Sequence, residues 1–131
     1  MVFGGKSASL AGSIIDLATL SSTKVGFTMN SPYYGGQVGY SVSGAGDVNK
    51  DGFADVIVGA PFFAGFSGVS YVVFGSNSAG LAGSVIDLAT LSSSKAGFTI
   101  NGAYAYDNSG RFILLCFLTT IIILFLMEKT K

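Results

Sequence analysis

The chain of 131 residues contains no histidine, no tryptophan, a single cysteine and two prolines. Without histidine, the most frequent general base of acid–base catalysis is missing. The lone cysteine, Cys116, excludes a disulfide framework and a cysteine–histidine metal site. Charged residues make up 11% of the chain, seven basic against seven acidic, so nothing indicates nucleic acid or an anionic surface as a partner. We therefore expect no enzymatic activity.

Glycine is abundant, with 19 residues, and β-branched and aromatic side chains are frequent. This mixture is typical of an all-β protein with many tight turns. The N-terminus lacks a charged segment followed by an apolar run, so a secretory signal peptide is not expected in this chain.

The segment 47–55, Asp-Val-Asn-Lys-Asp-Gly-Phe-Ala-Asp, places oxygen-bearing side chains at its first, third, fifth and ninth positions. A glycine at the sixth position permits a sharp turn, and Ca²⁺ prefers six to eight oxygen ligands. The predicted ligands are the side chains of Asp47, Asn49, Asp51 and Asp55 and the backbone carbonyl of Phe53. The alternative is an ordinary Asp/Asn/Gly turn that binds no ion.

The loop differs from an EF-hand, because Val58 stands where the bidentate glutamate is required. The short β-branched segments on either side, Tyr40–Ser43 and Val56–Val58, predict strands rather than helices. The expected site is therefore a calcium loop between two strands.

Two long stretches of the chain repeat each other at a constant offset. Val2-Phe3-Gly4 recurs at 73–75, Leu10–Ser13 at 81–84, Ile15–Ser22 at 86–93 and Gly26–Thr28 at 97–99, always 71 residues later. This period is long for a solenoid and suits a four-stranded propeller blade that carries an insertion.

Gly59-Ala60-Pro61 follows the second expected strand, and Phe74-Gly75 ends the third. Together with the D-x-N-x-D-G-x-x-D loop between strands, these motifs resemble the FG-GAP repeat, the blade unit of the integrin α-subunit β-propeller. The Ile-Asp-Leu-Ala-Thr-Leu insertion resembles that of large bacterial surface proteins of this family. The resemblance covers roughly residues 1–111 and implies calcium-braced blades whose opposite loops bind ligand.

The expected fold is all-β, about one and a half propeller blades of FG-GAP type followed by a hydrophobic C-terminal segment. Residues 1–36 are expected to be the C-terminal part of a first blade, with a loop at 31–36. Residues 37–101 are expected to form one complete blade, and 102–111 to begin a third. The strands of the complete blade are predicted near 38–43, 55–59, 68–74 and 97–100. In the first blade we expect an outer strand at 26–30, and a turn or single-turn helix at 14–20.

After Arg111 the repeat stops, and residues 112–127 form a run of sixteen residues without a charge. As a helix this run would measure about 24 Å, short of a hydrocarbon core of about 30 Å. Three interpretations stay open for the segment 112–131. It is a membrane anchor that thins the bilayer, an apolar segment without a role, or the product of a shifted reading frame.

The expected function is a calcium-binding structural or adhesion-type module of a cell-surface β-propeller. Its partners would be other blades or protein ligands, with membrane contact through Phe112–Met127. Four loop tyrosines could face a ligand: Tyr33, Tyr34, Tyr104 and Tyr106. The alternatives are a truncated, non-functional piece of a larger surface protein and an accessory propeller fragment of a secreted hydrolase, by resemblance to glycosylphosphatidylinositol-specific phospholipase D.

Overall fold

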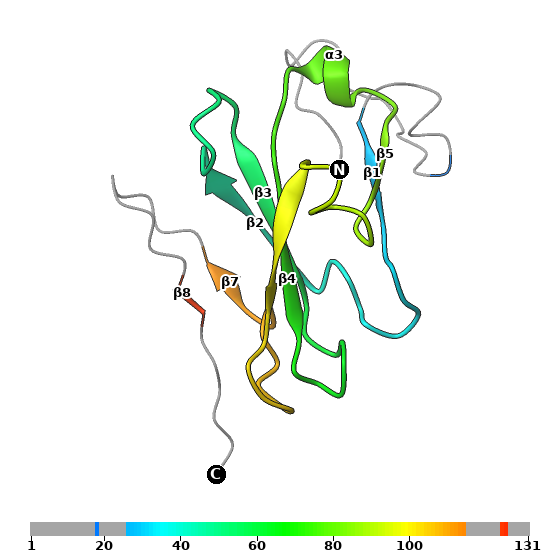
Figure 1. Ribbon diagram of the computed structural model, residues 1–131, viewed down its shortest axis with the longest axis vertical. Coiled ribbons are helices and arrows are strands. Elements are labelled where there is room, and N and C mark those ends of the chain that lie inside the picture. The colour runs from blue at the N-terminus through cyan, green and yellow to red at the C-terminus, as the bar shows by residue number, and fades with distance from the viewer. Residues whose placement is uncertain (1–17, 19–25, 115–123, 126–131) are drawn as a thin grey trace, which may run out of the picture.

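A computed structural model describes residue 18, residues 26–114 and residues 124–125 of the chain. Strands dominate this part (Figure 1), so the expected all-β class is confirmed. A single short helix is described, α3 (Ser78–Leu81). The expected turn or helix at 14–20 lies outside the described residues, apart from Ala18.

Four strands form an antiparallel sheet in the order β2-β3-β4-β6. They are β2 (Ser41–Gly46), β3 (Asp55–Ala60), β4 (Val69–Val73) and β6 (Gly97–Asn101). Strands β3, β4 and β6 start and end within one residue of the predicted limits. A small sheet of four antiparallel strands is the form of a propeller blade.

Strand β2 begins three residues later than expected. The chain turns first, because the Tyr40 N–H donates to the Gln37 carbonyl at 3.1 Å. The Gly39 N–H then donates to the Gly59 carbonyl at 3.0 Å, and the ladder with β3 starts at Ser41. It continues past a register shift between Gly44 and Gly46, which brings β2 up to the predicted calcium loop.

The segment between β4 and β6 contains more structure than the sequence predicted. After α3 it forms β5 (Val85–Asp87), which pairs in parallel with β1 (Thr28–Asn30). The strand expected at 26–30 is therefore confirmed over three residues, but its partner was not foreseen.

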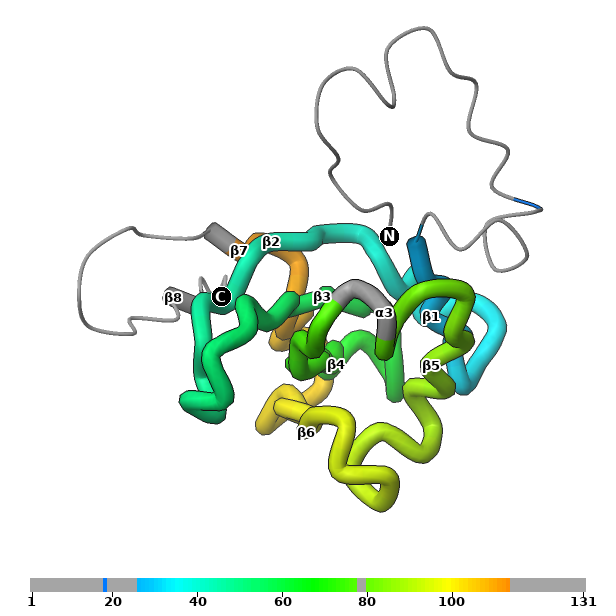
Figure 2. The backbone as a smooth tube through the Cα atoms, turned by 90° about the horizontal axis from the view of Figure 1, so that it is seen from above, coloured from blue at the N-terminus to red at the C-terminus, as the bar shows by residue number. Residues whose placement is uncertain are grey.

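Both faces of the sheet are covered by apolar residues. On one face Tyr71, Val73, Leu88 and Leu91 are buried, and Met29 and Ile86 pack against them. On the other face a second cluster contains Ala45, Ile57 and Val72, with Phe98, Ile100 and Ile113 packed against it. Seen along the strands in Figure 2, β1 and β5 lie on one side of the sheet and β7 (Ile113–Leu114) on the other. All five residues of β4 are buried, as expected for a strand between two layers.

Of the hydrophobic tail, only its first residues and two later ones are described. Strand β7 pairs antiparallel with β8 (Leu124–Phe125). The rest of the tail, and with it the interpretation as an anchor, lies outside the described residues. In the described part of the chain, no helix combines the length and the apolar character needed to cross a membrane.

Candidate metal centre

The predicted calcium loop connects β2 to β3 and lies at the upper left of Figure 1. Gly52, its sixth residue, has φ +89°, and an added Cβ would meet no atom within 4 Å. The glycine is thus required by the backbone conformation and not by a lack of space. This confirms the sharp turn that the sequence predicted at this position.

Three of the predicted ligands converge on the backbone of the turn. Asp47 accepts hydrogen bonds from the N–H groups of Asp51 at 3.0 Å and Gly52 at 2.9 Å. The amide oxygen of Asn49 accepts from the same Asp51 N–H at 3.2 Å, and the amide nitrogen of Asn49 donates to the Asp51 carboxylate at 2.7 Å. Asp47, Asn49 and Asp51 therefore lie side by side around one peptide group.

Phe53 follows the turn, and its N–H donates to the Asp51 carboxylate at 2.8 Å. This bond holds Phe53 next to the oxygen cluster, although its ring is 40% exposed. Its backbone carbonyl as a fifth ligand stays a prediction.

Asp55 differs from the other acidic residues because it is only 1% exposed. One carboxylate oxygen accepts from the Val48 N–H at 2.7 Å, and the other accepts from the Gly75 N–H at 2.8 Å. A buried carboxylate is costly unless its oxygens are hydrogen-bonded, and two short N–H bonds meet that need. Asp55 thereby joins the start of the loop to Gly75, two residues beyond the end of β4.

The structure also explains both glycine motifs. A Cβ on Gly75 would lie within 3.0 Å of the Ala54 carbonyl carbon, so only glycine allows this N–H to reach Asp55. A Cβ on Gly59 would collide with the main chain of Gly110, whose carbonyl accepts a hydrogen bond from the Ser41 hydroxyl. Gly59 and Gly75, which the sequence identified only through the motif, are thus sites of close backbone contact.

The donor set of the loop fits a hard cation. Three carboxylates and one amide oxygen lie in one nine-residue segment, and an oxygen that accepts one N–H keeps lone pairs for a metal. No group of three or more acidic, histidine or cysteine side chains in a metal-holding arrangement is found among the described residues. Calcium would therefore require Asp47, Asn49 and Asp51 to turn from the backbone N–H groups toward a shared centre.

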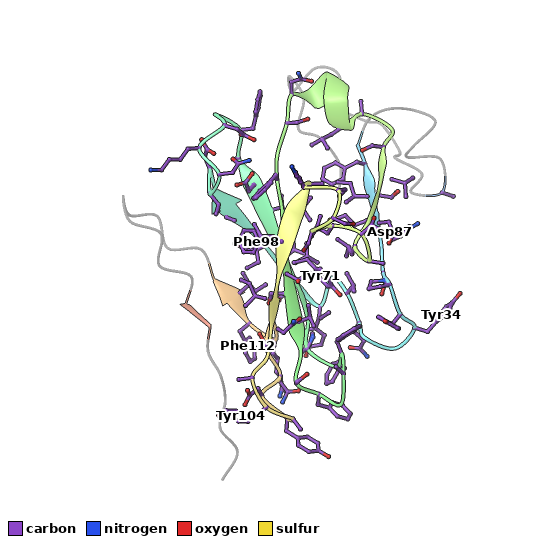
Figure 3. All side chains as sticks on the ribbon, viewed as in Figure 1. Tyr34, Tyr71, Asp87, Phe98, Tyr104 and Phe112 are labelled. Carbon is purple, nitrogen blue, oxygen red and sulfur yellow. The ribbon has the colours of Figure 1, made fainter. Side chains whose placement is uncertain are left out.

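A second feature lies at the opposite end of β3, about 17 Å from Asp55 along a six-residue strand. Aromatic rings from three loops form a chain of contacts there. Tyr40 contacts Phe62 edge-on at 5.6 Å, Phe62 contacts Phe66 at 5.7 Å, and Phe66 stacks on Tyr106 at 5.8 Å between ring centroids. Figure 3 shows the neighbouring Tyr104 at this lower end of the sheet.

A groove of about 520 Å³ lies beside these rings, bounded by the segments 33–36 and 62–64. Tyr33 packs edge-on against Phe63 at 4.9 Å, and Tyr34 points away from the molecule (Figure 3). Four tyrosines of this region were expected from the sequence to face a ligand, whereas Tyr40 and the phenylalanines were not foreseen. The density of rings in the segment Pro61-Phe-Phe-Ala-Gly-Phe66 was the signal available.

Comparison with protein families gives one match: the family model described as the FG-GAP repeat matches residues 38–73. No curated protein matches the chain, and no solved structure matches it. The matched segment runs from the turn before β2 to the end of β4 and includes the acidic loop and Gly59-Ala60-Pro61. Residues 38–73 of this chain therefore match the FG-GAP repeat.

Proposed function

We propose that this chain is a calcium-binding FG-GAP module that serves in adhesion-type binding at a cell surface. The observation that supports calcium most strongly is the placement of Asp47, Asn49 and Asp51 around one peptide group in the β2–β3 loop. Asp47 and Asp51 carry like charges at this turn, and a divalent cation would offset their repulsion.

Calcium would act here as a brace. Asp55 already connects the loop to Gly75, just beyond β4. A cation held by Asp47, Asn49, Asp51, Asp55 and the Phe53 carbonyl would link the β2 end of the loop to the same point. Binding and folding of the blade would then be coupled, since the unfolded chain offers no preformed site.

The ligand-contacting surface in this proposal is the aromatic end of the blade. Large exposed aromatic side chains are enriched at protein interfaces, where they supply contact area at low conformational cost. Tyr34, Tyr104 and Tyr106 are all more than 60% exposed, and they lie on loops at the end of the sheet remote from the acidic loop. Partners would be other blades or protein ligands, and no catalytic role is proposed.

The test is calorimetric titration of Ca²⁺ into the full chain, compared with Asp51→Ala. We expect one saturable site per chain, with a Kd of about 10⁻⁴–10⁻³ M if the site follows extracellular calcium modules. Asp51 is exposed and lies in the loop, so its loss should weaken binding by at least tenfold without unfolding the blade.

Asp87→Ala is the matched control, because Asp87 also caps a turn, accepting the Ala89 N–H at 2.9 Å, but lies outside the loop. It should bind Ca²⁺ like the wild type. Equal calcium binding by wild type and Asp51→Ala would refute the site, and no binding by the wild type would refute calcium as the ligand.

A further inference from the structure

The parallel pair β1–β5 joins two successive repeats, and its hydrogen bonds are specific. The Thr28 N–H donates to the Ser84 carbonyl at 3.1 Å, and the Gly83 N–H donates to the Gly26 carbonyl at 2.9 Å. At the far end the Leu88 N–H donates to the Asn30 carbonyl at 3.1 Å. The last strand of one repeat is therefore the docking edge for the insertion of the next.

Strand β6 is the counterpart of β1 in the second repeat. With the 71-residue offset, Gly26-Phe27-Thr28-Met29-Asn30 corresponds to Gly97-Phe98-Thr99-Ile100-Asn101, which is identical at four of the five positions. Yet β6 is the last strand of its sheet and has no neighbour beyond it among the described residues.

The backbone N–H and C=O groups of β6 are oriented to form the same hydrogen bonds that β1 forms with β5. The Phe74 N–H donates to the Ala96 carbonyl and the Gly102 N–H donates to the Gly68 carbonyl, which fixes the alternation along the β4–β6 ladder. Residues 98 and 100 face β4, so the N–H and C=O groups of Gly97, Thr99 and Asn101 point away from it. These are the counterparts of Gly26, Thr28 and Asn30, the residues of the first repeat that bind the insertion.

The matching insertion is also present in the chain. Gly83-Ser84-Val85-Ile86-Asp87-Leu88 corresponds to Gly12-Ser13-Ile14-Ile15-Asp16-Leu17, and the only difference is Val85 against Ile14. Residues 12–17 lie outside the described residues. Their sequence supplies every donor and acceptor that β5 and its neighbours offer to β1.

We propose that two copies of this chain associate head to tail, with Ile14–Asp16 of one copy added in parallel to Thr99–Asn101 of the other. The register would repeat the observed one, Thr99 opposite Ile14, Ile100 opposite Ile15 and Asn101 opposite Asp16. The Thr99 N–H would donate to the Ser13 carbonyl, and the Gly12 N–H to the Gly97 carbonyl. Because two different surfaces meet, the contact is heterologous and builds open chains or closed rings.

Burial at the two edges agrees with this assignment. Phe27, beside β1, is 3% exposed, whereas its counterpart Phe98 is only half-buried. Thr99 is exposed, whereas its counterpart Thr28 is half-buried, and Asn101 and its counterpart Asn30 are both exposed. An insertion docked on β6 would reduce the exposure of Phe98 and Thr99 to that of their counterparts Phe27 and Thr28 beside β1.

The test is site-directed cross-linking between two full-length chains, each with Cys116→Ser and one new cysteine. A chain with Thr99→Cys is mixed with a chain with Ile14→Cys and treated with a short bifunctional thiol reagent. The matched control replaces Ile15 in place of Ile14, because neighbouring strand residues point to opposite faces. Thr28→Cys with Val85→Cys in one chain is the positive control, since these residues are direct partners in the structure.

We expect the 99–14 mixture to give a cross-linked dimer in at least fivefold higher yield than the 99–15 mixture. Equal yields would show association without this register, for instance through the apolar tail, and would overturn the proposal. Absence of any dimer, while the 28–85 control reacts within its chain, would overturn it as well.

A second variant tests the backbone bond alone. Thr99→Pro removes the N–H that points away from β4, and a proline is tolerated on an edge strand at such a position. We expect the cross-link between Asn101→Cys in one copy and Asp16→Cys in the other to fall by at least fivefold in the Thr99→Pro background. An unchanged yield with an unchanged circular dichroism spectrum would contradict pairing at this edge.

Discussion

Asp55 is expected to support the fold independently of calcium, and this can be separated from its role as a ligand. Its two carboxylate oxygens accept the Val48 and Gly75 N–H groups at 2.7 and 2.8 Å, and the side chain is 1% exposed. A hydrogen bond to a buried charged group contributes about 1.5–3 kcal/mol. Asp55→Ala should therefore lower the free energy of unfolding by about 3–6 kcal/mol in the absence of calcium.

The assay is urea unfolding followed by circular dichroism with a calcium chelator present. Asp51→Ala is the control, because it also removes a carboxylate with two hydrogen bonds, but at an exposed position, where the cost should stay below about 1 kcal/mol. Asp55→Asn should fall between the two, since an amide oxygen can keep one N–H partner while its NH₂ group faces the other donor. If Asp55→Ala costs no more than Asp51→Ala in chelator, the connection between the loop and Gly75 does not stabilise the blade.

Three further predictions concern the motif glycine, calcium and alkaline pH. Gly59→Ala should destabilise the blade by about 1–3 kcal/mol, because its Cβ would collide with the Gly110 main chain. Gly36→Ala should cost less than about 1 kcal/mol, because its Cβ would approach only Phe63, with the ring at 3.3 Å. Urea unfolding of the two variants measures the difference. Calcium at a hundredfold excess over its Kd should stabilise the chain by about 2.7 kcal/mol and raise Tm by roughly 10 °C. Asp51→Ala should reduce this stabilisation to about half or less at the same calcium concentration, and an unchanged Tm in the wild type would contradict the prediction. Burial, and to a lesser degree the neighbouring Tyr33, raises the pKa of Tyr71, so the unfolded state releases this proton first and stability present below about pH 10 should fall as the pH rises further. Tyr71→Phe should remove this part of the alkaline loss of stability in urea titrations between about pH 8 and pH 11, and the same loss in wild type and variant would exclude Tyr71 as its source.

The sequence predicted three of the four strands to within one residue, because β-branched runs bounded by glycine and aspartate mark both ends of β3, β4 and β6, whereas β2 lies three residues later than expected. It missed the parallel pairing of β1 with β5, since β5 is three residues long and its partner lies 57 positions earlier. A contact of that kind depends on how two repeats pack and leaves no local pattern. The 71-residue repeat was the one signal available, and it becomes informative only when one copy of the contact is seen.

For the metal site, the spacing of oxygen-bearing residues located the loop, and Gly52 was correctly associated with its turn. The spacing treated Asp47, Asn49, Asp51 and Asp55 as equivalent. The structure separates the buried Asp55, which is fixed by Val48 and Gly75, from the three exposed residues. Burial and the long-range bond from the Gly75 N–H decide that difference, and neither is encoded in the segment 47–55 itself.

A structure of the full chain determined in the presence of Ca²⁺ would test the central claim most directly. We predict one cation in the β2–β3 loop, about 2.3–2.6 Å from side-chain oxygens of Asp47, Asn49, Asp51 and Asp55 and from the Phe53 carbonyl. A loop that keeps the hydrogen bonds from Asp51 and Gly52 to Asp47, with no cation within reach of these oxygens at saturating Ca²⁺, would contradict the claim.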